Sequence, residues 1–250
     1  MRRSSISVAV SVTRCIVTCP PLFPRDLAAG SLVALAVPAN EQLVGTQFAY
    51  FPQLEGTKEI GAQPSWGGAD IGSHLFYPAQ VVDGIVARLG GKELREVCAA
   101  LPVVDDYGTR CPVGRAVVTN APSQLGEHFD KIVHVVPPMW QKHGSSGCGK
   151  SLGVREKENE DKLLEAYDSL FECVLRLPPS STMLCPLLGC GARGAPVNVS
   201  ITAAVRSVLA LTKAASALPA GDRIVHFGIQ NPQLAESLEA ELAKVGLMSG

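Results

Sequence analysis

The chain has 250 residues, 46% of them hydrophobic and 18% charged, so it can bury the core of one large domain. Its formal net charge of -1 gives no electrostatic reason to expect nucleic acid or an acidic membrane as a partner. No apolar run reaches the length needed to cross a bilayer, because Arg, Asp, Pro or Gly interrupts every candidate.

Eight cysteines are spread through a chain that has enough apolar residues to fold without disulfides. Cys15 and Cys19 have no His or Cys partner at zinc spacing, so we expect no metal. This usage favours a reducing compartment. We therefore expect an intracellular protein, cytoplasmic or nuclear, that is a monomer and holds no cofactor.

The N-terminal segment admits two interpretations. Residues 1–18 contain three arginines and several serines, and no acidic residue precedes Asp26, as in a mitochondrial transit peptide. The same segment alternates apolar side chains at Ile6, Val8, Val10 and Val12, which is the period of a half-buried strand. We favour the strand, and mitochondrial targeting is the alternative.

Beyond this segment, apolar strands and amphipathic helices alternate. The predicted strands are 31–37, 115–119, 131–136, 182–188 and 223–229, and the predicted helices include 158–175, 199–211 and 232–245. Asn231 and Pro232 suit the N-cap and the first position of the last helix. This alternation predicts an α/β fold with a sheet covered on both faces and a ligand crevice at the carboxyl ends of the strands.

Two stretches are too long for ordinary connections. Residues 46–78 are rich in Gly, Pro, Gln and aromatics without a clear period, and residues 141–155 form a loop of Gly, Ser and Lys. We interpret both as insertions in a single domain that spans residues 1–250.

A first motif surrounds the strand at 31–37. Arg25-Asp26-Leu27 precedes this strand and Pro38-Ala39-Asn40 follows it, which resembles the opening of the macro domain family. There a Gly-Asp-Ile-Thr segment and an Asn-Ala-Ala-Asn segment stand at the same interval, although Val37 replaces the first Asn here. The resemblance implies that Asp26, beside Leu27, accepts a hydrogen bond from the adenine amino group, a role that suits a carboxylate.

A second motif opens a helix. Val82-Asp83-Gly84-Ile85-Val86 resembles the Val-Asp-Gly-Ala-Ile helix that follows a glycine-rich loop in this family. The family's catalytic-type Asp maps onto Asp83, and Val82 becomes a ligand-binding candidate. The His of that helix is replaced by Ala87, and Pro-Ala-Gln-Val at 78–81 replaces the glycines. We expect a weakened first phosphate loop, because backbone amides approach a phosphate closely only where side chains are small.

Two further segments resemble strands of the family and mark the fold more than its chemistry. They are Cys-Pro-Val-Gly-Arg-Ala at 111–116 and Ile-Val-His-Val-Val-Pro-Pro at 132–138. His134 lies within an apolar strand, and we interpret it as a hydrogen-bonded core residue and not as a base.

A last motif covers residues 186–196, Pro-Leu-Leu-Gly-Cys-Gly-Ala-Arg-Gly-Ala-Pro, and is similar to the family's Pro-Ala-Ile-Ser-Thr-Gly-Val-Phe-Gly-Tyr-Pro. The resemblance implies that its backbone amides, near a helix N-terminus, wrap a diphosphate. The ligand-binding candidates are Gly189, Cys190, Gly191, Ala192, Arg193 and Gly194. Arg193 replaces an aromatic residue and is expected to pair with a phosphate. Phe227 either packs near adenine or belongs to the core.

Taken together, the resemblance implies a three-layer α/β/α sandwich with a central mixed sheet. It implies binding of ADP-ribose or mono-ADP-ribosylated proteins. The alternative is an ADP-ribosyl ester hydrolase acting on mono-ADP-ribosylated protein or O-acetyl-ADP-ribose, with Asn40 and Asp83 as catalytic residues.

A competing motif, Gly-Ser-Ser-Gly-Cys-Gly-Lys-Ser at 144–151, satisfies the P-loop pattern in full and makes a nucleotide-binding protein a remote alternative. A P-loop joins a buried strand directly to a helix, whereas here the segment 137–143 intervenes. Leu152-Gly153-Val154 also gives no clear helix start.

Overall fold

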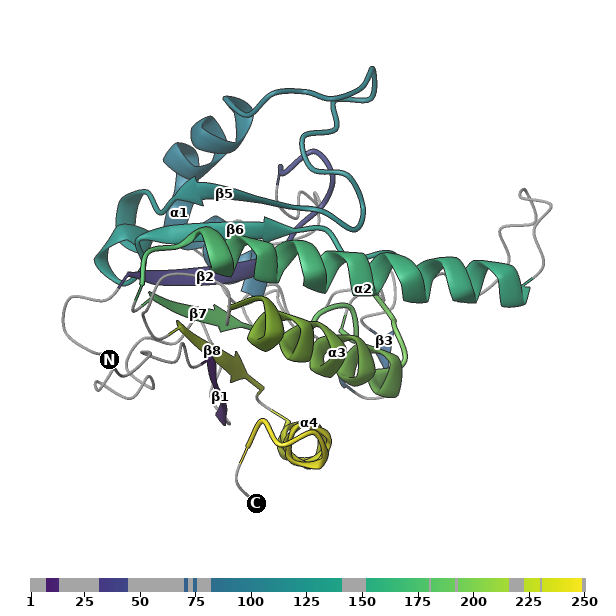
Figure 1. Cartoon of the computed structure of the whole chain (residues 1–250). Coiled ribbons are helices and arrows are strands. Elements are labelled where there is room, and N and C mark those ends of the chain that lie inside the picture. Colours follow the sequence, from purple (N-terminus) through teal and green to yellow (C-terminus); the bar gives the residue numbers. More distant parts are fainter. Residues whose placement is uncertain are drawn as a thin grey trace.

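The fold is built on a six-stranded sheet with the strand order β1-β8-β7-β2-β6-β5 (Figure 1). It is seen in a computed structural model that describes residues 8–13, 32–44, 70–71, 74–75, 82–140, 152–179, 181–191, 193–215, 223–229 and 231–248. The strands are β1 (Val8–Thr13), β2 (Val33–Pro38), β5 (Ala116–Asn120), β6 (Lys131–Val135), β7 (Ser181–Cys185) and β8 (Arg223–Gly228). Two short strands, β3 (Asp70–Ile71) and β4 (His74–Leu75), pair separately within the predicted insertion at 46–78.

The sheet is mixed, as expected. Every pairing between β1, β8, β7, β2 and β6 is parallel, and only the edge strand β5 runs antiparallel, against β6. The N-terminal strand is confirmed, because β1 pairs along its whole length with β8. The continuation of this strand toward Ile16 and Val17 lies outside the described residues.

Alternating side chains of the central strands face two separate cores. In β2, Ala34 and Ala36 face one core, and Leu35 and Val37 face the other. All four are essentially inaccessible to solvent, which is why β2 is a nearly continuous apolar run and not a polar-apolar alternation.

The helices divide between these two faces (Figure 1). Helix α1 (Val82–Ala99) and the short 3₁₀ helix η4 (Ser123–Glu127) cover the core of Leu35 and Val37. Helices α2 (Leu152–Arg176), α3 (Val197–Ala215) and α4 (Pro232–Lys244) cover the other core. The three-layer α/β/α sandwich is therefore confirmed.

The start of α2 corrects two sequence-based expectations. The helix begins at Leu152, so the loop predicted over 141–155 is too long at its C-terminal end, and the view that no helix starts near Leu152 is wrong. The apolar stripe that predicted this helix begins only near Leu163, because the turns before it carry mostly charged side chains and the start of the helix projects beyond the rest of the molecule (Figure 1). The P-loop pattern at 144–151 lies outside the described residues.

The last helix begins as predicted. The Asn231 side chain accepts hydrogen bonds from the backbone N–H groups of Gln233 and Leu234, at 3.0 and 3.2 Å, and Pro232 occupies the first helical position. One face of α4 buries Ala235, Leu238 and Leu242 in the core shared with α2 and α3.

In the part of the chain that the structure describes, no helix is long and apolar enough to span a membrane. The same residues contain no group of three or more His, Cys, Asp or Glu side chains that could hold a metal ion. The cysteines that are described carry free thiols: Cys98, Cys111, Cys173, Cys185 and Cys190.

Candidate functional site

Those predicted ligand segments that the structure describes converge at one edge of the sheet. Because β2, β6 and β7 are parallel and adjacent, the residues after them emerge at the same edge. The N–H of Ala39, after β2, donates to the carbonyl of Val135 at the end of β6 at 2.7 Å. The N–H of Trp140, beyond β6, donates to the carbonyl of Arg193 in the loop after β7 at 2.8 Å. Three strand ends are thus tied into one site.

The glycine-rich loop after β7 depends on its glycines. Gly189 has φ +81° and Gly194 has φ +74°, a region that residues with a Cβ rarely adopt. A Cβ on Gly194 would lie 3.2 Å from the carbonyl oxygen of Trp140. The loop closes on itself through hydrogen bonds from Gly194 N–H to the Gly191 carbonyl and from Ala195 N–H to the Gly189 carbonyl, both 2.9 Å. This compact loop leads directly into α3.

Gly191 lies on the open side of this loop. A Cβ built on it would meet no atom of the described residues within 4 Å. A backbone that is tightly turned at Gly189 and Gly194 but open at Gly191 can present its amides to a ligand at close range.

Arg193 is the cation of the site. Its guanidinium Nη2 donates to the carbonyl of Ala39 at 2.5 Å, which joins the loop after β7 to the end of β2. Burial lowers the pKa of Arg193, and the nearby carboxylates of Glu41 and Asp83 oppose this shift. An arginine remains protonated under such conditions, so the site holds a partly desolvated positive charge.

Asn40 shapes the turn that follows β2. Its side-chain carbonyl oxygen accepts from the Val44 N–H at 3.2 Å, and its backbone carbonyl accepts from the Leu43 N–H at 3.1 Å. Leu43 adopts φ 57°, in the left-handed region that costs energy for a residue with a Cβ. The next residue, Glu41, uses its carbonyl to accept from Arg110 and Cys111, so the turn is also fixed to the loop before β5.

Asp83 lies in the first turn of α1, where a carboxylate interacts favourably with the helix dipole. Its charge raises the pKa values of both Arg193 and Cys98, so its carboxylate lies within electrostatic range of both side chains. Val82 is half-buried and packs against the core that α1 covers. The structure therefore brings together Asn40, Asp83 and Arg193, which lie far apart in the sequence.

Cys190 is the other described side chain of the loop. Burial raises the pKa of its thiol to about 11, and a hydrogen bond with Ser200 partly offsets this shift. Its Sγ lies 3.6 Å from the carbonyl oxygen of Leu187. The thiol is therefore protonated at neutral pH and is no nucleophile there.

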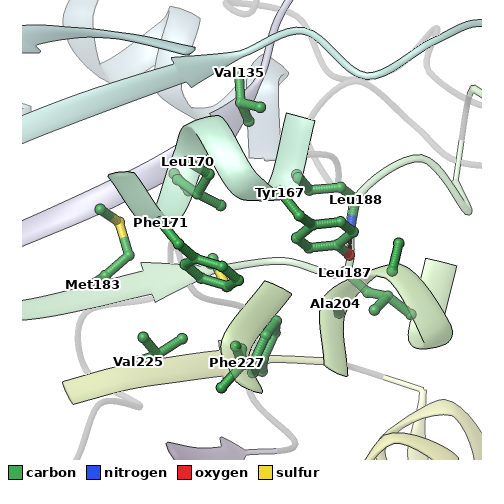
Figure 2. Packing of buried hydrophobic residues seen from close by; sticks show 14 of the residues in the cluster. Val135, Tyr167, Leu170, Phe171, Met183, Leu187, Leu188, Ala204, Val225 and Phe227 are labelled. Carbon is green, nitrogen blue, oxygen red and sulfur yellow. Dashed lines mark hydrogen bonds between the residues drawn. The ribbon is translucent and has the colours of Figure 1, made fainter. Parts of the chain in front are cut away.

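Phe227 does not reach this site. It is fully buried between the sheet and the helices α2 and α3, in the same core as Tyr167 and Phe171 (Figure 2). Of the two interpretations left open by the sequence, the structure favours the core residue. Asp26, Leu27 and Ala192 lie outside the described residues.

His134 is also a core residue. Its Nε2 lies 3.0 Å from the Thr119 hydroxyl and 3.7 Å from the Cys98 sulfur, beneath α1. Burial lowers the pKa of His134 to about 4. The imidazole is therefore neutral at physiological pH, which agrees with the structural role expected from the sequence.

The structure adds residues that the sequence did not suggest. Glu41 contributes a carboxylate near Arg193, Trp140 closes the glycine-rich loop, and Tyr167 and Ser200 hold the base of that loop. Of these four residues, only Trp140 could have been found from the sequence, because it follows the two prolines that end the motif at 132–138.

A sequence model of the macro domain matches residues 74–204 of this chain. A search of curated proteins finds no match. Among solved structures, the Oceanobacillus iheyensis macrodomain with ADP is 17% identical, with 86% of this chain and 84% of that chain covered and a TM-score of 0.54.

Two other structures show the same fold. A point mutant of the Oceanobacillus iheyensis macrodomain with ADPR is 16% identical, with 94% of this chain and 91% of that chain covered and a TM-score of 0.55. The Trypanosoma brucei macrodomain in complex with ADP is 16% identical, with 94% and 69% covered and a TM-score of 0.57. Since the family match spans more than half of the sequence, the chain belongs to the macro domain family.

Proposed function

We propose that this protein binds ADP-ribose, free or attached to a protein, at the carboxyl edge of its sheet. The observation that carries the proposal is the partly buried Arg193 guanidinium, held against the end of β2 by its bond to Ala39 and flanked by the glycine-rich loop. A fixed cation beside backbone amides at a helix N-terminus is suited to a diphosphate, even in a protein with a net charge of -1.

The proposed orientation of the ligand rests on the described loop for the diphosphate and on the family resemblance for Asp26, which lies outside the described residues. The diphosphate would lie on the loop from Gly189 to Gly194, the adenine would meet Asp26, and the distal ribose would lie between Asn40 and Asp83. The structures with ADP and ADPR named above support this class of ligand, since they have the same fold.

Replacement of Arg193 by methionine tests the proposal. Methionine keeps much of the side-chain length but removes the charge, so the affinity for ADP-ribose should fall about 10- to 150-fold, the range of one charge-assisted hydrogen bond. Arg193→Lys should recover only part of the affinity, because lysine lacks the planar fork of arginine. Isothermal titration calorimetry gives both dissociation constants.

Arg206→Met is the matched control for this experiment. Arg206 is exposed on α3 and lines a groove between α2 and α3, away from the glycine-rich loop. This variant should bind ADP-ribose like the wild type. Equal affinities for wild type, Arg193→Met and Arg206→Met would remove the guanidinium from the binding site.

Hydrolysis of an ADP-ribosyl ester is the second candidate function. It is supported by the position of the Asp83 carboxylate, close enough to Arg193 to affect its pKa and at the edge where Asn40 emerges. A carboxylate in this position could activate a water or stabilise positive charge on the distal ribose. The missing glycines before α1 argue for slow turnover, because a misplacement of about 1 Å can cost a hundredfold in rate.

Release of ADP-ribose from a mono-ADP-ribosylated acidic protein or from O-acetyl-ADP-ribose measures this activity. If the protein is a hydrolase, Asp83→Ala should lower the rate much more than it lowers the affinity for ADP-ribose, since the lost interaction acts mainly in the transition state. Asn40→Ala should weaken both. A wild-type protein that binds ADP-ribose but releases none above background would be a binding module only.

A further inference from the structure

The base of the glycine-rich loop is held by a closed ring of hydrogen bonds. The Leu188 N–H donates to the Tyr167 hydroxyl oxygen at 2.7 Å, and the Ser200 hydroxyl donates to the Leu188 carbonyl at 2.5 Å. The hydroxyls of Tyr167 and Ser200 lie 3.2 Å apart, which closes the ring. Figure 2 shows the Tyr167 hydroxyl directed at the backbone nitrogen of Leu188.

The direction of every bond in this ring is determined. The Ser200 hydroxyl has one hydrogen, and it is used by the Leu188 carbonyl, which can only accept. Ser200 must therefore accept from Tyr167, and Tyr167 in turn accepts from the Leu188 N–H. Ser200 also forms a hydrogen bond with the Cys190 thiol, and removing either hydroxyl of the ring leaves a polar group of Leu188 without its partner.

All three residues are completely buried, where no solvent can replace a lost bond. Tyr167 comes from α2, Ser200 from the first turn of α3, and Leu188 from the segment that follows β7. The ring therefore joins three segments at a single residue, Leu188, through the N–H and the carbonyl of its two adjoining peptide groups.

Leu188 is the residue at which the loop starts. Leu188 directly precedes Gly189, whose φ of +81° starts the turn and whose carbonyl accepts from Ala195 on the far side of the loop. A Cβ on Gly189 would lie 3.2 Å from Leu163 and 3.3 Å from Ala195, so the backbone there has little room to move. A rotation of the Leu188 peptide would change the direction of the amides that follow it.

We infer that Tyr167 and Ser200 are positioning residues for the anion-binding loop, acting on the ligand only through Leu188. This inference rests on the proposed binding of ADP-ribose. The ring holds the amides of the loop in the orientation that receives a diphosphate, so that little ordering is required on binding.

Tyr167→Phe and Ser200→Ala test the inference with two readouts. Each variant should bind ADP-ribose about tenfold more weakly in calorimetry at a temperature where circular dichroism shows it fully folded. The double variant should be little weaker than either single variant, because the ring acts as one unit. Ser200→Thr, which keeps the hydroxyl, should restore affinity.

The second readout needs no ligand. Amide hydrogen exchange at Leu188, Gly194 and Ala195 should be about tenfold faster in Tyr167→Phe than in wild type. Ser207→Ala is the matched control, because Ser207 also joins α3 to α2, through Asp168, but lies away from the loop. It should lower the melting temperature and leave both the affinity and the exchange at these three amides unchanged.

The outcomes separate this inference from the proposed function. If the folded Tyr167→Phe variant keeps wild-type affinity and exchange rates, the positioning role is wrong, whatever the wild type binds. If the wild type does not bind ADP-ribose, the proposed function is wrong, and the exchange rates alone then decide whether the ring orders the loop. Equal effects in Ser207→Ala would reduce Tyr167 and Ser200 to general contributors to stability.

Discussion

Phe227→Ala should lower the free energy of unfolding by about 3–5 kcal/mol, the range for removing a buried aromatic side chain. Phe227 has no exposed surface and packs against the layer formed by α2 and α3, so the surrounding side chains can fill only part of the space it leaves (Figure 2). Urea denaturation of wild type and variant measures the difference. A smaller loss is expected for Phe227→Leu, which keeps most of the apolar contact.

The affinity for ADP-ribose distinguishes a core residue from an adenine contact. Phe227→Leu should remain folded at room temperature and bind ADP-ribose with wild-type affinity. A variant of wild-type stability but strongly reduced affinity would instead place Phe227 against the ligand, as the alternative from the sequence allowed.

Acidification should destabilise the protein through His134. Burial lowers its pKa to about 4 in the folded state, whereas a histidine in an unfolded chain titrates near 6.5. The unfolded state therefore binds the proton first. The stability associated with neutral His134 is fully present above about pH 6.5 and is lost as the pH falls through about 4, with a total effect of about 3 kcal/mol.

Urea denaturation at several pH values between 7 and 4 measures this effect. His134→Gln has no titrating group, and its amide can still bond to Thr119, so its unfolding free energy should depend less steeply on pH than that of the wild type. Other groups, including His226, also titrate, and the difference between the two curves isolates His134. Parallel curves for the two proteins would show that His134 is accessible to protons in the folded state.

The sequence predicted the strands and helices whose pattern of apolar residues follows directly from their burial. The strand at 131–136 was located closely because its apolar residues face both cores, and the strand at 223–229 because Val225 and Phe227 face one of them. The start of α2 was missed because its first turns contact little of the core and therefore need no apolar stripe. The periodicity of apolar residues indicates which side chains are buried, and most side chains in these first turns are exposed.

The site was predictable only in part, for a similar reason. Asn40, Asp83 and Arg193 were identified from motifs, and the structure brings them to one edge. Tyr167 and Ser200 could not be found, because a tyrosine in the apolar stripe of a helix looks like any core residue. Its hydroxyl acquires a role only when β7 ends beside it in the folded protein.

Calorimetric titration of the wild-type protein with ADP-ribose, and separately with ATP, tests the central claim most directly. If the diphosphate lies between the loop after β7 and the end of β2, as proposed, the protein should bind ADP-ribose with a 1:1 stoichiometry and ATP far more weakly. Binding of ATP in preference to ADP-ribose, or no heat of binding with ADP-ribose, would contradict the account.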